Sequence, residues 1–236
     1  KKSFFLGGQV LNAALNADEE TSARILKELK IPYLTYGISA NADLFARDIE
    51  ISENGVNFQI KLRGIEEMAV NMQMTGMFNV YNALAAASLA MIVGVDQEAI
   101  REGLASVHAV PGRIEMLDTG TPYKVILDYS HSPDALENIL TTVRMFTKKR
   151  VIVLFGCGGD RDHGKRPIMG EISGKLADYS ILTSNNPRTE NPDAILEAIE
   201  EGMKLTKGKY TIIENRREAI RYALRMGREG DVIILA

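Results

Sequence analysis

The sequence predicts an α/β protein whose second half forms a Rossmann-like, mostly parallel sheet. Two observations lead to this fold class: short apolar runs of β type alternate with stretches of helical period, and capping or turn residues stand between them. The β-type runs cover residues 124–129, 150–155, 179–183, 209–213 and 231–236, and the helical stretches cover 133–147, 167–177, 192–206 and 215–227. This alternation is typical of β-α-β units, in which each helix returns the chain to the next parallel strand.

Local signals support the first of these helices. Ser132 and Pro133 are residue types preferred at a helix N-cap and at the first helical position. The apolar residues that follow recur at intervals of three and four, which places them on one face of the helix: Leu136, Ile139, Leu140, Val143 and Phe146. We expect this face to cover the sheet.

The first half of the chain has a different pattern. A helical stretch is expected at 19–30, followed by a strand-like run at 31–36. Two further β-type runs, 44–51 and 56–62, flank Glu53-Asn54-Gly55. Because Asn-Gly between alternating runs is the strongest short-range hairpin signal, we expect these two runs to pair.

The end of the first half is expected to be helical. A long apolar helix is predicted at 79–93, and Asp96 can cap another at 97–107. The sequence Val110-Pro111-Gly112 then breaks the pattern, so we expect a domain boundary near residue 110.

The composition excludes several classes of protein. Of 236 residues, 45% are apolar and 25% charged, which is typical of a soluble globular chain with one or two domains. A net charge of −3 gives no general basic field to hold nucleic acid or an anionic membrane, so neither is expected as a partner. The single cysteine, Cys157, cannot form an internal disulfide, and no apolar run is long enough for a membrane span. We therefore expect a cytoplasmic protein.

Three polar loops follow predicted strands, at 128–133, 156–167 and 184–188, and the second of them is rich in glycine. In an open parallel sheet, ligands bind beyond the carboxyl ends of the strands, where the positive N-termini of helices point. We expect the three loops to meet at one edge of the sheet and to form a binding crevice.

The middle loop does not match two familiar nucleotide-binding motifs. A dinucleotide fingerprint requires glycine at the position of Arg161. A phosphate loop ending at Lys165 requires a hydroxyl residue next, where Arg166 stands, and Asp160 and Asp162 would repel phosphates. The mixed charge instead favours an amino-acid subsite, in which Arg161 pairs with a carboxylate and the acidic side chains receive an ammonium.

In the next loop, Arg188 could clamp a second carboxylate beside Asn185 and Asn186. Taken alone, Asn-Pro-Arg is also the pattern of a turn with a solvated charge. Three polar loops at one sheet edge favour the binding interpretation.

Histidine and cysteine residues give weaker indications. His131 stands at a strand end beside Asp128, and two interpretations stay open: a hydrogen-bonded structural histidine or a contact to nucleotide. The spacing of the histidines and Cys157 does not resemble a zinc site. We expect Cys157 to be an inert small residue rather than a nucleophile.

Six segments together resemble the Mur ligases, ATP-dependent enzymes that add amino acids to a UDP-muramoyl peptide in peptidoglycan synthesis, and so serve cell-wall formation, cell shape and cell division. They stand in the family's order and cover nearly the whole chain: 16–19 (NADE), 78–86 (FNVYNALAA), 110–115 (VPGRIE), 128–136 (DYSHSPDAL), 156–167 (GCGGDRDHGKRP) and 185–190 (NNPRTE). Within the family the chain is most similar to members that add the third residue of the peptide stem. The resemblance implies that this residue is meso-diaminopimelate and that a UDP-N-acetylmuramoyl dipeptide is the other substrate.

The resemblance also implies domains and nucleotide contacts. Residues 1–110 would be the C-terminal part of the central ATPase domain, and 111–236 would be the amino-acid-binding domain without its last loop. Of the residues that would bind ATP, Asn82 matches the contact to adenine, Arg113 the contact to the phosphates and Asp128 the contact to the ribose, and His131 belongs to the same motif. More distantly, Lys1 aligns with a lysine that becomes carbamylated and helps to hold Mg²⁺.

For the amino acid, the resemblance implies that Arg161 binds a carboxylate of diaminopimelate. The segment Asn185, Asn186, Pro187 and Arg188 matches the family's selectivity motif. Here the resemblance agrees with the physical argument, because diaminopimelate differs from lysine by one carboxylate and a desolvated arginine can supply the discrimination. No residue of this chain is assigned a catalytic role.

The sequence departs from the family pattern in three respects. Asn185 replaces an aspartate at the start of the selectivity motif, so addition of L-lysine stays open. No phosphate loop is present, and the family's closing Gly-Lys-Gly-His-Glu is not found before the chain stops at Ala236. We expect a C-terminal fragment that is inactive by itself. A folylpolyglutamate or cyanophycin-type ligase and a non-catalytic amino-acid-binding module also stay open as interpretations.

Overall fold

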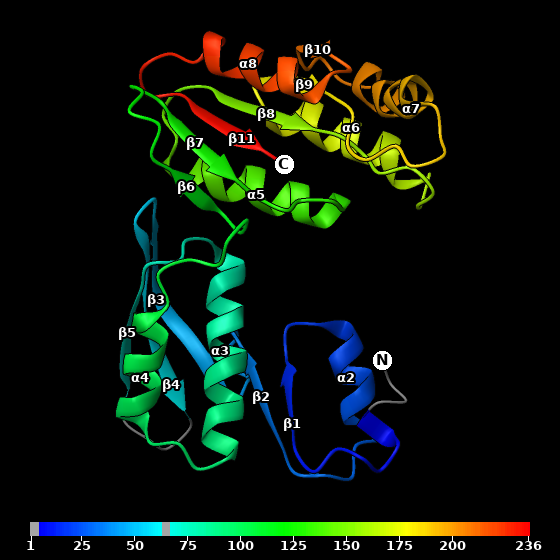
Figure 1. Cartoon of the computed structure of the whole chain (residues 1–236). Helices are drawn as coiled ribbons and strands as arrows, with labels where there is room; N and C mark the ends of the chain where they lie inside the picture. Colours follow the sequence, from blue (N-terminus) through cyan, green and yellow to red (C-terminus); the bar gives the residue numbers. More distant parts are fainter. Residues whose placement is uncertain (1–4, 63–66) are drawn as a thin grey trace. The chain divides into compact units, whose positions relative to one another are not determined.

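The computed structural model describes residues 5–62 and 67–236, and the chain divides into two compact units, 1–108 and 109–236 (Figure 1). Both units are mixed α/β structures, which confirms the predicted fold class. No helix in the described ranges is both long and apolar enough to cross a lipid bilayer.

The first unit is built on a sheet of order β1-β2-β3-β4-β5, in which β1, β2 and β3 are parallel and β3, β4 and β5 antiparallel. Its elements are β1 (Ala13–Asn16), α2 (Glu20–Leu26), β2 (Tyr33–Gly37), β3 (Leu44–Ser52), β4 (Gly55–Leu62), β5 (Met68–Met72), α3 (Met77–Ile92) and α4 (Gln97–Ser106). Helix α3 packs against the parallel strands, and α4 packs on β5. Apolar residues of β3, β4, β5 and α3 form the core of this unit.

Two predictions for this unit are confirmed. The runs flanking Asn54-Gly55 pair as an antiparallel hairpin, with Ser52 opposite Gly55. Asp96 caps α4, since its side chain accepts a hydrogen bond from the backbone N–H of Ala99. The helix predicted over 19–30 was too long: α2 ends at Leu26, because a turn from Glu28 to Ile25 closes it shortly before Pro32.

The second unit contains a sheet of order β10-β9-β8-β11-β7-β6, in which only the edge strand β6 runs antiparallel. Its elements are β6 (Glu115–Leu117), β7 (Lys124–Leu127), α5 (Pro133–Phe146), β8 (Val151–Phe155), α6 (Lys165–Leu176), β9 (Tyr179–Leu182), α7 (Pro192–Lys204), β10 (Tyr210–Ile212), α8 (Arg216–Met226) and β11 (Val232–Leu235). The predicted order of strands and helices is therefore found in the second half. The last strand, β11, inserts between β7 and β8, so the direction of strand addition changes there.

Helices cover both faces of this second sheet (Figure 1). Helix α8 packs through Ala219 and Ala223 on one face, and α5, α6 and α7 pack beside one another on the other. As predicted, Ser132 caps α5 with Pro133 at the start of the helix. Of the apolar face expected for α5, Leu136, Ile139, Leu140 and Val143 are buried and Phe146 is partly buried.

Candidate functional site

A cavity of about 370 Å³ lies at the carboxyl ends of β7, β8 and β9, where the three polar loops meet. Its lining residues come from all three loops: Tyr129, His131, Gly158, Arg161, Lys165, Asn185, Asn186 and Arg188. The structure thus brings together five residues that the sequence singled out, His131, Arg161, Asn185, Asn186 and Arg188. Pro187 belongs to the same loop as Arg188 but does not line the cavity. Its carbonyl oxygen packs closely against Gly159 of the neighbouring loop.

The cavity is cationic. Arg161, Lys165 and Arg188 line it, and none of its lining residues is an aspartate or a glutamate. The ammonium of Lys165 donates to the backbone carbonyl of His131 at 2.6 Å, which ties the start of α6 to the loop after β7. Such a lining suits a ligand that carries carboxylates.

The loops after β8 and β9 interlock through their backbones. The N–H of Gly159 donates to the carbonyl of Asn186 at 3.1 Å, and Nη1 of Arg188 donates to the carbonyl of Gly159 at 2.6 Å. A Cβ atom at Gly159 would stand 1.9 Å from the carbonyl oxygen of Pro187, and one at Gly156 would stand 2.0 Å from that of Thr183. The glycines are therefore needed for the close approach of the two loops, rather than for a dinucleotide.

Three residues of these loops have a left-handed backbone although none is glycine: Asp160 at φ 52°, Asn186 at 46° and Arg188 at 53°. Such conformations cost of order 1 kcal/mol or more each, and they persist where surrounding contacts fix them. Asparagine and aspartate have short polar side chains that can hydrogen-bond to the local backbone in this region, whereas the long side chain of arginine does not favour it. The backbone of Arg188 is thus held by its neighbours.

The acidic side chains of the middle loop do not serve the predicted role. The carboxylate of Asp160 accepts hydrogen bonds from the N–H and hydroxyl of Thr189, and Oδ1 of Asp162 accepts one from the N–H of Gly164. Neither residue lines the cavity. These carboxylates close the loops, and no acidic side chain lines the cavity in which they were expected to receive the ammonium of an amino acid.

Glu190 and Arg166 form an ion pair beside the cavity that the sequence did not indicate. Arg166 is only 3% exposed, and its Nη2 lies 2.8 Å from Oε1 of Glu190. The same oxygen accepts the N–H of Asp160 at 2.5 Å and lies 3.3 Å from Nε2 of His163. Hydrogen bonds from Arg166 and from the N–H of Asp160 lower the pKa of Glu190 to about 2. An acidic residue two positions after Arg188, facing a loop rich in arginine, was the available signal.

The predicted nucleotide residues of the second unit lie in or beside the loop after β7. The guanidinium of Arg113 lies 5.6 Å from the ring centroid of Tyr129, and the rings of Tyr129 and His131 are 4.7 Å apart. Tyr129 is 62% exposed, so this row of cation and rings is open to solvent. Exposed π-faces beside a guanidinium can accept a base or a phosphate.

Asp128 holds the backbone at the start of the unit. Its Oδ2 accepts the N–H of Ile114 at 2.9 Å, and its other oxygen accepts the hydroxyl of Ser130. Ile114 has φ 44°, an unfavourable value for a β-branched residue, so this hydrogen bond stabilises a strained junction next to Arg113. The Asp128 carboxylate, which was predicted to contact the ribose, therefore makes hydrogen bonds within the protein.

The remaining predicted residues lie elsewhere. Asn82 is exposed on α3 in the first unit, and its Nδ2 donates to Oδ1 of Asn79 at 3.1 Å. Lys1, the predicted magnesium residue, lies outside the described residues. Within residues 5–62 and 67–236, no group of three or more His, Cys, Asp or Glu side chains is arranged to hold a metal ion.

Cys157 is buried, and its Sγ lies 3.7 Å from Sδ of Met169. Burial raises the pKa of its thiol to about 11, against a smaller opposing effect of Lys165 and Arg166. A thiol of this kind is protonated at neutral pH, which confirms the prediction of an inert cysteine.

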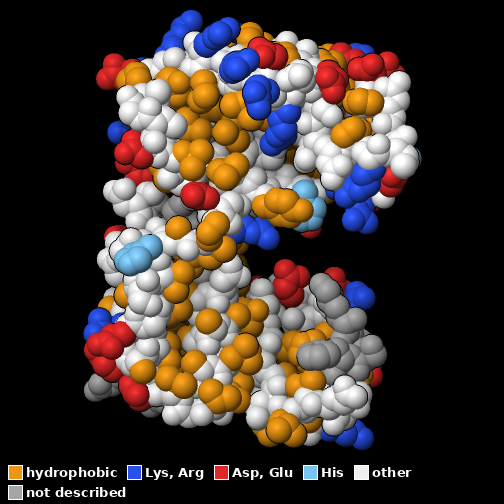
Figure 2. All heavy atoms as spheres, viewed as in Figure 1, with side chains coloured by type: hydrophobic (Ala, Val, Ile, Leu, Met, Phe, Trp, Pro, Cys, Tyr) orange, Lys and Arg blue, Asp and Glu red, His pale blue; other side chains and the backbone are white. Residues whose placement is uncertain are grey.

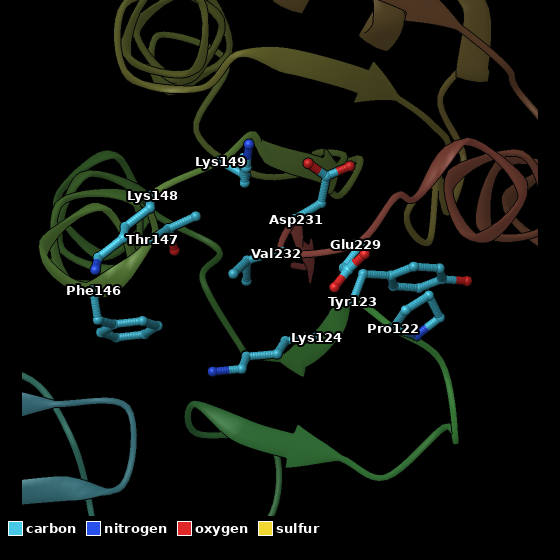
Figure 3. Close-up of a pocket in the computed structure, with 11 residues that line it drawn as sticks. Pro122, Tyr123, Lys124, Phe146, Thr147, Lys148, Lys149, Glu229, Asp231 and Val232 are labelled. Carbon is cyan, nitrogen blue, oxygen red and sulfur yellow. The ribbon is translucent and has the colours of Figure 1, made fainter.

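A second hollow of about 600 Å³ lies at the opposite edge of the sheet, at the amino ends of β7, β8 and β11 (Figure 3). Lys148 and Lys149 stand at its rim, and Asp231 lies in its wall. The Asp231 carboxylate accepts from Nη2 of Arg150 at 2.5 Å and from two backbone N–H groups, so it is already satisfied within the fold. Basic side chains also gather over α8 (Figure 2), where Arg221 pairs with Glu218 on the same helix.

Family models match most of the chain. Residues 112–236 match the Mur ligase glutamate ligase domain, and residues 1–90 match the Mur ligase middle domain. The chain belongs to the Mur ligase family. Members of this family use ATP and Mg²⁺. The Mur ligase fold found here also occurs in a Mycobacterium tuberculosis folylpolyglutamate synthase solved with ADP and AMPPCP, at a TM-score of 0.74 and 19% identity over 95% of this chain and 52% of that one.

Two curated relatives bear the name UDP-N-acetylmuramoyl-L-alanyl-D-glutamate–2,6-diaminopimelate ligase. The protein from Syntrophomonas wolfei is 46% identical over 95% of this chain and 46% of its own length, and that from Geobacillus thermodenitrificans is 43% identical over 95% and 46%. A solved structure with the same name matches at a TM-score of 0.63 and 31% identity, over 100% of this chain and 49% of that one. This Mur ligase chain therefore spans about half the length of the curated relatives it matches.

Proposed function

We propose that this chain forms the amino-acid-binding part of an ATP-dependent ligase that adds meso-diaminopimelate to UDP-N-acetylmuramoyl-L-alanyl-D-glutamate. The names of its relatives support the reaction. The observation that carries the proposal is the cavity of the second unit. Arg161 and Arg188 both line it, and they come from the loops after the neighbouring strands β8 and β9. Two guanidinium groups in one small cavity suit an amino acid with an additional carboxylate.

The proposed reaction divides into two steps. ATP phosphorylates the terminal carboxylate of the muramoyl dipeptide, and the amine of diaminopimelate then attacks the acyl phosphate. The residues of this chain bind and orient: Arg161 and Arg188 hold the carboxylate that diaminopimelate has and lysine lacks, and Asn185 and Asn186 supply neutral hydrogen-bonding groups. A fixed orientation of the attacking amine is the main contribution to rate that such a subsite can make.

We propose that Arg113, Asp128, His131 and Asn82 face the nucleotide. The exposed row of Arg113, Tyr129 and His131 supports this for the second unit. Magnesium would neutralise phosphate charge when bound, and we assign none of the described residues to it.

The domain assignment is also a proposal. Residues 1–110 would be the C-terminal part of the central ATPase domain and 111–236 the amino-acid-binding domain, in line with the two matched family models. We propose a cytoplasmic location, which the free, buried thiol of Cys157 supports.

L-Lysine is the second candidate for the incoming amino acid. It is favoured only by Asn185, which stands where the family's selectivity motif has an aspartate. The cationic lining argues against it, because lysine has a net positive charge, whereas diaminopimelate has a second carboxylate that offsets its second ammonium beside Arg161, Lys165 and Arg188.

Calorimetric titration of the 236-residue protein tests the proposal. We expect meso-diaminopimelate to bind at least about tenfold more tightly than L-lysine, because a desolvated arginine pair with a carboxylate is worth more than one decade of affinity. Equal affinities for the two diamines would contradict it.

A further inference from the structure

The carboxylate of Glu190 joins both arginine-bearing loops, although it does not line the cavity. Its Oε1 accepts the backbone N–H of Asp160 at 2.5 Å and lies 2.8 Å from Nη2 of Arg166 at the start of α6. The Glu190 side chain is 21% exposed, so these contacts are shielded in part from solvent. One oxygen thus fixes three segments: the loop after β8, the first turn of α6 and the loop after β9.

The two residues before Glu190 reach across to the same loop. Thr189 donates from its N–H and its hydroxyl to the carboxylate of Asp160, and Arg188 donates from Nη1 to the carbonyl of Gly159. Three consecutive residues of one loop therefore attach to residues of the other. Because Arg188 and Asp160 both have left-handed backbones, these attachments are the contacts that keep an unfavourable conformation populated.

Arg166 makes the glutamate difficult to replace. Its side chain is 4% exposed, and its Nε is buried without a hydrogen-bond partner among the described residues. Glu190 is the carboxylate that forms an ion pair with this buried cation. Loss of that charge would leave Arg166 poorly compensated and would favour movement of the segment that carries Arg188.

We propose that Glu190 is a positioning residue, which acts through Asp160 and Arg166 to hold the guanidinium of Arg188 in the cavity and thereby sets selectivity for a ligand with a second carboxylate. The identity of that ligand rests on the proposed function. The positioning itself is a property of the protein without ligand. The identity of the ligand and the positioning of Arg188 by Glu190 can therefore be tested separately.

The ligand-dependent test compares Glu190→Gln with Glu201→Gln, which changes an exposed carboxylate on α7. In Glu190→Gln we expect the affinity for meso-diaminopimelate in calorimetry to fall about tenfold or more and that for L-lysine to stay the same, because only the former uses the carboxylate clamp. Glu201→Gln should match the unmodified chain for both ligands. An unchanged affinity for meso-diaminopimelate in Glu190→Gln, or an equal loss for both ligands, would overturn the proposal.

The ligand-free test follows the guanidinium of Arg188 by NMR. Its side-chain N–H signals, assigned from their loss in Arg188→Lys, should be slowed in rotation and exchange in the unmodified chain and averaged in Glu190→Gln. Signals that remain equally restrained in Glu190→Gln would overturn the positioning role. If the unmodified chain binds neither amino acid, the proposed function fails, and this second measurement still decides the role of Glu190.

Discussion

Arg188 reaches from one loop of the cavity to the backbone of the other, and its Nη1 donates to the carbonyl oxygen of Gly159 at 2.6 Å. A guanidinium has five N–H donors in a rigid plane, so this contact leaves four for a ligand. The hydrogen bond also fixes the direction of the plane. Arg188 is thus oriented before any ligand arrives, which reduces the entropy lost on binding.

Replacement of Arg188 by alanine should weaken the binding of meso-diaminopimelate by roughly 2–4 kcal/mol if the ligand carboxylate is desolvated. Binding of L-lysine should change little, because lysine has no second carboxylate. Arg188→Lys should recover only part of the loss, since an ammonium keeps the charge but not the fork of parallel donors. Calorimetric titration measures all three. An equal loss for both amino acids would show that the substitution acts on the fold of the loop alone.

Gly159→Ala should destabilise the second unit by about 1–3 kcal/mol, because the added methyl group would stand 1.9 Å from the carbonyl oxygen of Pro187 and force the loops apart. Gly103→Ala is the matched control. Gly103 lies in α4 with open space around its Cβ position, so that change should be neutral or stabilising by about 0.5–1 kcal/mol. Urea unfolding measures both, and equal effects of the two substitutions would count against the interlocked loops.

The sequence predicted the second unit better than the first, for physical reasons. Buried parallel strands such as 151–155 are continuous apolar runs in the sequence. The start of α5 is marked by two independent signals, the capping residue Ser132 and the first helical residue Pro133. Strand β5, Met68–Met72, was not predicted, because methionine has no marked β preference. The alternation of buried and exposed residues along this strand is seen only in the folded sheet. The antiparallel edge strand β6 has three residues, too few for a periodic pattern.

For the candidate site, the sequence indicated which loops would meet, because the carboxyl ends of parallel strands share one edge. It could not indicate which charges would be used inside the fold. Asp160 and Asp162 were assigned to a ligand but close the loops, whereas the pair of Arg166 and Glu190 was not recognised. These partners are 24 residues or more apart in two of the three contacts, and only their three-dimensional arrangement shows which charge meets which.

Acid should remove the contribution of Glu190 to stability. Its pKa in the folded chain is about 2, below the ordinary value of 4.5, because Arg166 and the N–H of Asp160 favour the charged form, with His163 adding a smaller effect. A group with a lowered pKa stabilises the fold above its ordinary pKa and loses this contribution as the pH falls from 4.5 toward 2.

The difference in melting temperature between the unmodified chain and Glu190→Gln should therefore be full near neutral pH and shrink steadily below about pH 4.5, since glutamine does not titrate. Thermal unfolding followed by circular dichroism at a series of pH values measures this. A difference that stays constant down to about pH 2 would contradict the assigned ion pair.

Asp231→Asn should destabilise the second unit by about 2 kcal/mol, because the carboxylate is 3% exposed and its loss leaves Arg150 without its charged partner. The effect should be confined to stability, since Asp231 lies at the amino-terminal edge of the sheet in the hollow of Figure 3. Urea unfolding gives the stability, and calorimetry should show unchanged affinity for meso-diaminopimelate. A loss of that affinity without a loss of stability would instead indicate that the second hollow takes part in binding.

The most direct test of the central claim is a crystal structure of the chain with meso-diaminopimelate. We expect the carboxylate that diaminopimelate has and lysine lacks to lie within hydrogen-bonding distance of both Arg161 and Arg188, in the cavity formed by the loops after β7, β8 and β9. A ligand that binds elsewhere, or that contacts neither guanidinium, would contradict the claim that these two arginines together recognise a carboxylate of the incoming amino acid.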